Sequence, residues 1–134
     1  MFGKLSFIEA NEYEPSYLFG AKDFQPLNSK IEYQFYNDNK IVTQEQKEWV
    51  ISIESKYSYL EVEIENFIND ELTKMNDKIT KYSLKKDLTI EFITIPKLLD
   101  PVVEWSLTYG VNKDFLFLTV EFRDWKPNFL SISA

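Results

Sequence analysis

The feature that most constrains this chain is an apolar stripe in the middle of the sequence that recurs at the period of an α-helix. Its members stand three or four positions apart, and they are Trp49, Ile53, Tyr57, Leu60, Ile64, Phe67 and Ile68. Such spacing places all of them on one side of a helix, and that side has to be buried against another layer of structure. The sequence therefore predicts a long amphipathic helix packed on the rest of the chain.

The start of this helix is marked by a capping box. Thr43 stands three positions before Gln46. At this spacing the threonine side chain accepts a hydrogen bond from the third helical N–H, while the glutamine side chain reaches back to the threonine amide. We therefore expect the helix to begin directly after Thr43.

The end of the helix is less sharply marked, because the apolar phase continues to Tyr82. A straight helix over about 44–82 would be about 58 Å long, whereas a compact chain of this size is only about 36 Å across. Asn69 can cap a second helical segment that begins at Asp70. We therefore expect one long helix, or a helix broken at Asn69-Asp70.

In the sequence before and after the predicted helix, apolar and polar residues alternate, and this period of two is typical of β-strands. Three runs after Lys86 have one apolar face each, made of Leu88, Ile90 and Phe92, of Val103, Trp105, Leu107 and Tyr109, and of Leu116, Leu118, Val120 and Phe122. A turn over 110–114 favours an antiparallel hairpin between the second and third runs. Shorter strands are expected within 4–9, 17–21, 31–36 and 129–133.

This order of strands, helix and strands predicts an α+β fold in which a mostly antiparallel sheet packs on the one long or broken helix. A chain of 134 residues is long enough for one domain core and short for two, so we expect a single domain over 1–134. The core should join two sets of residues, Trp49, Ile53, Leu60 and Ile64 of the helix and Trp105, Leu107, Leu118 and Val120 of the strands.

The composition removes several classes of function. The chain has no cysteine and no histidine, so histidine-based catalysis, thiolate nucleophiles and the common zinc sites have no side chains to build on. Its three glycines are too far apart for a phosphate-binding loop. We expect no catalytic residue, no metal and no other cofactor, and hence a protein that is not an enzyme.

The charge and hydropathy narrow the partners and the location. A net charge of −7 and a single arginine disfavour nucleic acid, which proteins bind largely through Lys and Arg. No apolar run approaches the roughly 18 residues of a membrane span, and no signal peptide is visible at the start. We therefore expect a cytoplasmic protein that binds neither nucleic acid nor a membrane.

One segment combines acidic and aromatic side chains. In "FIEANEYEPSY", residues 7–17, Glu12 and Glu14 alternate with Tyr13 and lie close to Tyr17. Pro15 interrupts any helix there, so the segment is expected to be a loop between two strands. Tyrosine gives rigid contact area with a polar tip and is enriched at protein interfaces. The loop is therefore a candidate binding surface, and the alternative is a solvated loop without function.

A second candidate surface lies on the predicted helix. Glu54, Glu61 and Glu65 are separated by seven and four positions, which places their carboxylates on one side of a helix. An acidic face of this kind accelerates association with a basic protein, and the helical region could also pair with a second copy as a homodimer. The alternative is a solvated helix face that has no partner.

The chain resembles a family at several places, namely the helix opening "TQEQ" with its long aromatic stripe and the later segments "TIPKLLDP", "EWSLTYG" and "VEFRDWKPN". In these it is similar to small bacterial α+β domains found beside polymorphic or contact-dependent toxins, the immunity-protein type. The resemblance implies a cytoplasmic protein that binds and neutralises a toxin.

These observations favour a protein-binding module, an immunity or inhibitor protein that binds a basic protein through an acidic, tyrosine-containing surface. The predicted binding residues are Glu12, Tyr13, Glu14, Tyr17, Glu54, Glu61 and Glu65. Two other hypotheses remain open. The first is a small-ligand or carbohydrate-binding domain that uses the aromatic residues, and the second is an enzyme that relies on carboxylates.

Overall fold

The computed structural model describes residues 2–75 and 81–134. Its strands are β1 (Ser6–Ile8), β2 (Tyr17–Phe24), β3 (Ser29–Tyr36), β4 (Leu88–Ile95), β5 (Glu104–Val111), β6 (Phe117–Arg123) and β7 (Lys126–Ser133). Its helices are the 3-10 turn η1 (Gln25–Leu27), the long α1 (Gln44–Met75) and the short α2 (Leu84–Asp87). The predicted α+β fold is confirmed.

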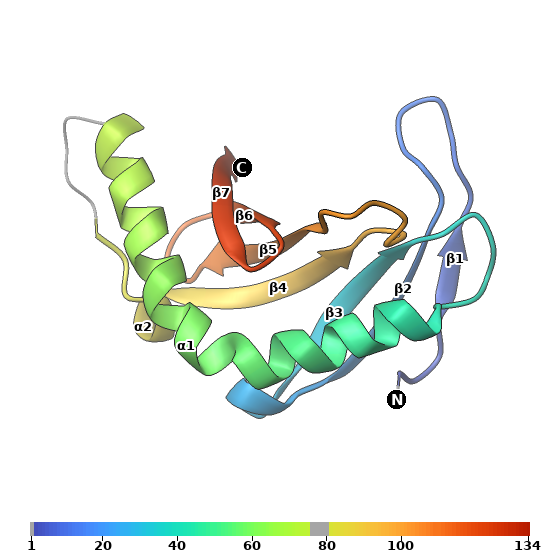
Figure 1. Cartoon of the computed structure of the whole chain (residues 1–134). Coiled ribbons are helices and arrows are strands. Elements are labelled where there is room, and N and C mark those ends of the chain that lie inside the picture. Colours follow the sequence, from blue (N-terminus) through green and yellow to red (C-terminus); the bar gives the residue numbers. More distant parts are fainter. Residues whose placement is uncertain (1, 76–80) are drawn as a thin grey trace.

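The seven strands form one sheet whose spatial order is the order of the sequence, and α1 lies across one face of it (Figure 1). All neighbouring strands are antiparallel except β3 and β4, which are parallel. Parallel neighbours cannot be joined by a tight turn, because the chain has to return along the length of the strands. The long connection through α1 makes this return.

α1 is one continuous helix of 32 residues that bends near its middle (Figure 1). The bend lets a helix about 48 Å long follow the sheet, so that neither a break nor a straight protrusion is needed. Of the two expected forms, the continuous helix is the one that the structure shows, because Asn69 and Asp70 both lie inside α1. The helix is described as far as Met75; of its predicted continuation to 82, residues 76–80 lie outside the described part, and Tyr82 is not helical.

Asn69 has another role than capping. Its side-chain oxygen accepts a hydrogen bond from the amide of Tyr82 at 2.8 Å, and its side-chain nitrogen donates to the carbonyl of Tyr82 at 3.0 Å. Farther along, the amide of Leu84 donates to Glu65 at 2.7 Å. These bonds hold the chain that returns toward β4 against the side of α1.

The predicted apolar stripe of α1 is buried on the sheet. Ile53, Tyr57, Leu60, Ile64 and Ile68 are buried in one cluster with Trp105, Leu107, Leu118 and Val120, as expected, whereas Trp49 and Phe67 are only half-buried at its margin. Trp49 stacks on Trp125 with ring centroids 4.4 Å apart, and Trp125 meets Trp105 edge-on at 5.7 Å. The three tryptophans of the chain therefore join one flank of α1 to the sheet.

The predicted position of Phe92 in the core is wrong. A β-bulge between Ile90 and Phe92 shifts the register of β4 against β5, so the buried side chains of β4 are Leu88 and Ile90 before the bulge and Ile93 and Ile95 after it. A bulge adds one residue to a strand and reverses the alternation that follows. Phe92 consequently lies on the face of the sheet opposite α1.

The continuity of α1 can be tested by Asp70→Pro. Inside a helix, proline removes a hydrogen bond and clashes with the preceding turn, so this variant should lose about 3 kcal/mol or more of unfolding free energy. At the first position of a second helix, the same proline would be well tolerated. Chemical denaturation followed by circular dichroism measures the difference. If Asp70→Pro were as stable as the wild type, the helix would have to be broken at Asn69-Asp70.

Candidate interaction surface

A buried polar cluster lies at the first turn of α1, where Gln46 is fully buried. Its side chain completes the predicted capping box, since it accepts from the amide of Thr43 at 3.0 Å while the Thr43 hydroxyl accepts from the amide of Gln46 at 3.1 Å. The Gln46 amide nitrogen also donates to the carbonyl of Tyr36 at 3.3 Å and to that of Pro96 at 2.9 Å. These two carbonyls lie at the ends of β3 and β4, so one side chain joins the helix to both parallel strands.

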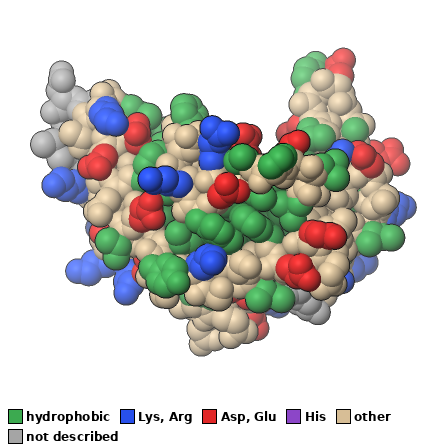
Figure 2. Space-filling view, in the orientation of Figure 1, with side chains coloured by type: hydrophobic (Ala, Val, Ile, Leu, Met, Phe, Trp, Pro, Cys, Tyr) green, Lys and Arg blue, Asp and Glu red, His purple; other side chains and the backbone are tan. Residues whose placement is uncertain are grey.

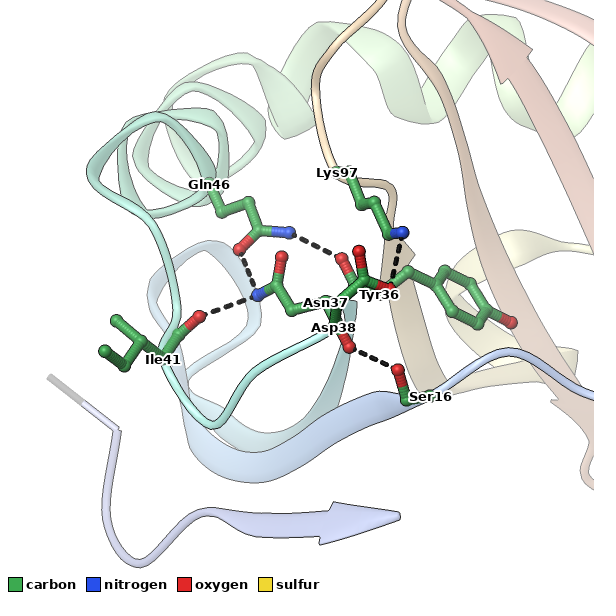
Figure 3. A network of polar contacts seen from close by, with 7 residues as sticks. All are labelled: Ser16, Tyr36, Asn37, Asp38, Ile41, Gln46 and Lys97. Atoms are coloured by element: carbon green, nitrogen blue, oxygen red, sulfur yellow. Dashed lines mark hydrogen bonds and ion pairs between the residues drawn. The ribbon is translucent and has the colours of Figure 1, made fainter. Parts of the chain in front are cut away.

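Asn37 extends this network to the loop between β1 and β2 (Figure 3). Its side-chain nitrogen donates to Gln46 and to the carbonyl of Ile41, each at 2.8 Å. Its carbonyl accepts from the Ser16 hydroxyl at 2.6 Å, and its amide donates to the carbonyl of Ser16 at 3.3 Å. The base of the β1–β2 loop is thus held by the same buried polar cluster as the helix.

The β1–β2 loop stands out from the body of the molecule, and acidic and hydrophobic surface lie side by side at its top (Figure 2). The side-chain oxygen of Asn11 accepts from the amides of Tyr13 at 2.7 Å and Glu14 at 2.9 Å, which closes a turn. Tyr13 is 85% exposed at this turn, between the exposed Glu12 and Glu14. The loop therefore presents an aromatic ring and two carboxylates on a hydrogen-bonded turn, in agreement with the predicted loop.

Tyr17 continues this surface onto the sheet. Its ring meets those of Tyr36 at 6.1 Å and Phe19 at 6.2 Å. Burial raises the pKa of the Tyr36 phenol, and the nearby Glu14 carboxylate and the Tyr17 phenol raise it further. The predicted residues Glu14 and Tyr17 therefore converge on Tyr36, which sequence analysis did not identify as part of a site.

The face of the sheet opposite α1 forms a shallow hollow next to this loop. Cross-strand pairing aligns a row of side chains across it, in the order Phe19, Gln34, Thr94, Ser106, Glu121 and Phe129. The hollow has a volume of about 520 Å³, and it is lined also by Tyr36, Phe92, Thr108 and Thr119. We call this surface the open face; it has a small polar centre with aromatic rings around it.

The open face is mainly acidic. Glu32, Glu104 and Glu121 project from its strands, and Glu91 lies on the same face, with its carboxylate beside Gly110. A Cβ atom on Gly110 would lie only 2.4 Å from the Glu91 carboxylate, so glycine at this position makes room for the acid. Arg123 is paired with Glu104 at 3.9 Å.

The three predicted helix carboxylates do not form a free acidic face. Glu54 is only 12% exposed and pairs with Lys22, and the Tyr33 hydroxyl donates to it at 3.4 Å. Glu61 is 16% exposed and lies 3.8 Å from Lys85, while Glu65 accepts from the backbone of α2. They share one side of α1 as expected, but that side lies against neighbouring elements, so each carboxylate serves a contact within the chain.

The described residues contain neither a candidate metal site nor a membrane-spanning helix. Across 2–75 and 81–134, no group of three or more Asp or Glu side chains is placed to hold a metal ion. No helix in this part of the chain is long and apolar enough to cross a membrane. Comparison with protein-family models, curated proteins and solved structures finds no match to this chain.

Glu14→Gln tests how the loop lies against the sheet. Removing a negative charge beside a phenol favours its ionised form, so the pKa of Tyr36 should fall toward its ordinary value. Glu12→Gln is the matched control, since Glu12 is no cause of the shift. Titration of the tyrosine ring resonances by NMR gives both values. An unchanged pKa of Tyr36 in Glu14→Gln would place the loop away from the open face.

Proposed function

We propose that this chain is a protein-binding module that docks a basic protein on the open face and the β1–β2 loop. The observation that carries the proposal is the combination of Tyr13, almost fully exposed on a closed turn, with a sheet face that is lined by aromatic and acidic side chains. Aromatic rings dominate the energy of many protein interfaces, and tyrosine provides contact area at low entropic cost. These are the properties of a preformed docking surface.

The charge of this surface indicates the chemistry of the partner. Glu12 and Glu14 on the loop and Glu32 and Glu121 on the open face carry negative charge, while two nearby cations, Lys97 and Arg123, are each paired with an acid of the chain. Complementary charges steer the encounter of two proteins, and like charges exclude wrong partners. A partner with a basic surface is therefore favoured over nucleic acid or an acidic protein.

The proposal retains the predicted loop residues and replaces the helix acids. Glu12, Tyr13, Glu14 and Tyr17 remain in the docking surface, whereas Glu54, Glu61 and Glu65 are engaged within the fold. The resemblance to immunity-type domains suggests a more specific proposal, namely that this surface inhibits a basic toxin by covering the toxin's functional site.

The test begins with the immobilised chain, which is used to isolate a partner, and continues with binding kinetics. Tyr13→Ala should shorten the lifetime of the complex, because it removes contact area. The double change Glu12→Lys and Glu14→Lys should slow association at low salt, and the effect should fade at high salt as screening grows over about 8 Å.

Glu63→Lys is the matched control, because Glu63 is exposed on α1 and away from the open face. It should leave both rates close to wild type. A partner that binds Tyr13→Ala and the double loop variant with wild-type kinetics, but is weakened by Glu63→Lys, would place the docking surface on α1 and overturn the proposal.

A further inference from the structure

A second concavity lies beside the open face, at the connection between β4 and β5. It is a groove of about 560 Å³, which is within the size range of pockets that bind ligands. Tyr36, Pro96 and Glu104 line both this groove and the hollow of the open face, so the two concavities are continuous. The groove also reaches the β1–β2 loop, since Pro15 lines it. An occupant of the groove would therefore lie next to a partner docked on the open face.

The β4–β5 connection is held at both of its ends. At the start, the carbonyl of Pro96 accepts a hydrogen bond from the Gln46 side chain at 2.9 Å. At the end, the amide of Val103 donates to a side-chain oxygen of Asp124 at 3.0 Å, and the amide of Asp124 donates to the carbonyl of Val103 at 2.7 Å. These bonds fix the points at which the intervening segment leaves and rejoins the sheet.

The walls of the groove are apolar and open to solvent. Leu99 is 83% exposed and Val102 is 36% exposed, and both line the groove together with the half-buried Leu98. Single exposed apolar side chains are common on protein surfaces, whereas a group of them around a concavity is typical of an interaction site. The groove therefore suits an apolar side chain of another molecule.

The backbone at Leu98 supports this interpretation. Its φ is 63°, in the left-handed region that glycine adopts freely and a bulky residue only at a cost. Strained positions of this kind are concentrated at functional sites. Glycine at this position would relieve the strain, but it would also remove a side chain that lines the groove. The chain thus keeps an apolar side chain on a backbone that favours glycine.

The charge around the groove is acidic. The nearby cations, Lys97 and Arg123, are each paired with an acid of the chain. Asp100 lines the groove and forms no ion pair with any described residue, and neither does Glu14. The Glu14 carboxylate lies beside the groove, since it raises the pKa of the Tyr36 phenol. Uncompensated negative charge next to apolar walls favours an occupant that is itself flanked by cations.

We propose that this groove receives an apolar side chain of the basic partner, one that stands between lysine or arginine residues on the partner's surface. The apolar side chain packs on Leu98, Leu99 and Val102, and Asp100 and Glu14 attract the cations beside it. The inference rests on the proposed function, because the occupant belongs to the protein that docks on the open face.

The first test needs no partner. It uses the full chain, observed by ¹H–¹⁵N NMR, and three peptides with capped ends, namely Lys-Phe-Lys, Lys-Ser-Lys and Glu-Phe-Glu. At millimolar concentration, Lys-Phe-Lys should give saturable shifts at the amides of Leu98, Leu99 and Val102. The other two should bind more weakly, because one lacks the apolar side chain and the other is repelled by the acids. If Lys-Phe-Lys gives no saturable shifts there, or if all three peptides bind equally, the inference is wrong.

The second test assigns this binding to the wall of the groove. Leu99→Ser should weaken Lys-Phe-Lys by about fivefold and leave the thermal unfolding midpoint unchanged, because the side chain is exposed. Ile51→Ser is the matched control, since Ile51 is 54% exposed on α1 and does not line the groove. Equal affinities of the two variants for the peptide would contradict the inference.

The partner isolated for the proposed function separates the two proposals. Leu99→Ser should shorten the lifetime of its complex by about fivefold, and Ile51→Ser should leave that lifetime unchanged. A complex that is shortened by Tyr13→Ala but not by Leu99→Ser would leave the proposed function standing and overturn the inference about the groove.

Discussion

The architecture depends on the amide group of Gln46. Two neighbouring strands run parallel, and the chain that connects them has to leave β3 and enter α1 at the same edge of the sheet where β4 ends. Buried backbone carbonyls at such an edge are costly unless they find donors. The Gln46 side chain donates to the carbonyls of Tyr36 and Pro96 and accepts from Thr43 and Asn37, so it fixes the helix, both strands and the adjacent loop with respect to one another.

Two consequences for function follow from this arrangement. A single helix can cover only one face of a seven-stranded sheet, so the opposite face is left to be filled by small polar and aromatic side chains. The same buried cluster holds the base of the β1–β2 loop through Ser16, which places Tyr13 and its neighbouring carboxylates at the edge of that face. The surface that we propose for docking and the buried amide network therefore depend on the same arrangement of helix, strands and loop.

Sequence reasoning identified the parts of the fold that depend on local pattern. The capping box at Thr43, the apolar stripe of α1 and most of the strands follow from spacing alone, and so does the exposure of the loop around Tyr13.

Spacing could not show that Gln46 also reaches Pro96, 50 positions away. It also could not show the bulge after Ile90, which moves Phe92 to the open face, because alternation carries no signal for one extra residue. The helix acids were misjudged because their tertiary partners, such as Lys22, are distant in sequence. The polar positions between the apolar ones, from Gln34 to Thr119, were the available signal for the open face.

The most direct test of this account is the stability of Gln46→Met, a change that keeps the length of the side chain and removes its hydrogen bonds. Because several buried partners lose their bonds, the unfolding free energy measured by chemical denaturation should fall by at least about 3 kcal/mol. Gln44→Met, two positions earlier and exposed, should stay within about 0.5 kcal/mol of wild type. A Gln46→Met variant as stable as Gln44→Met would show that the helix, the strands and the loop are held in place without this amide.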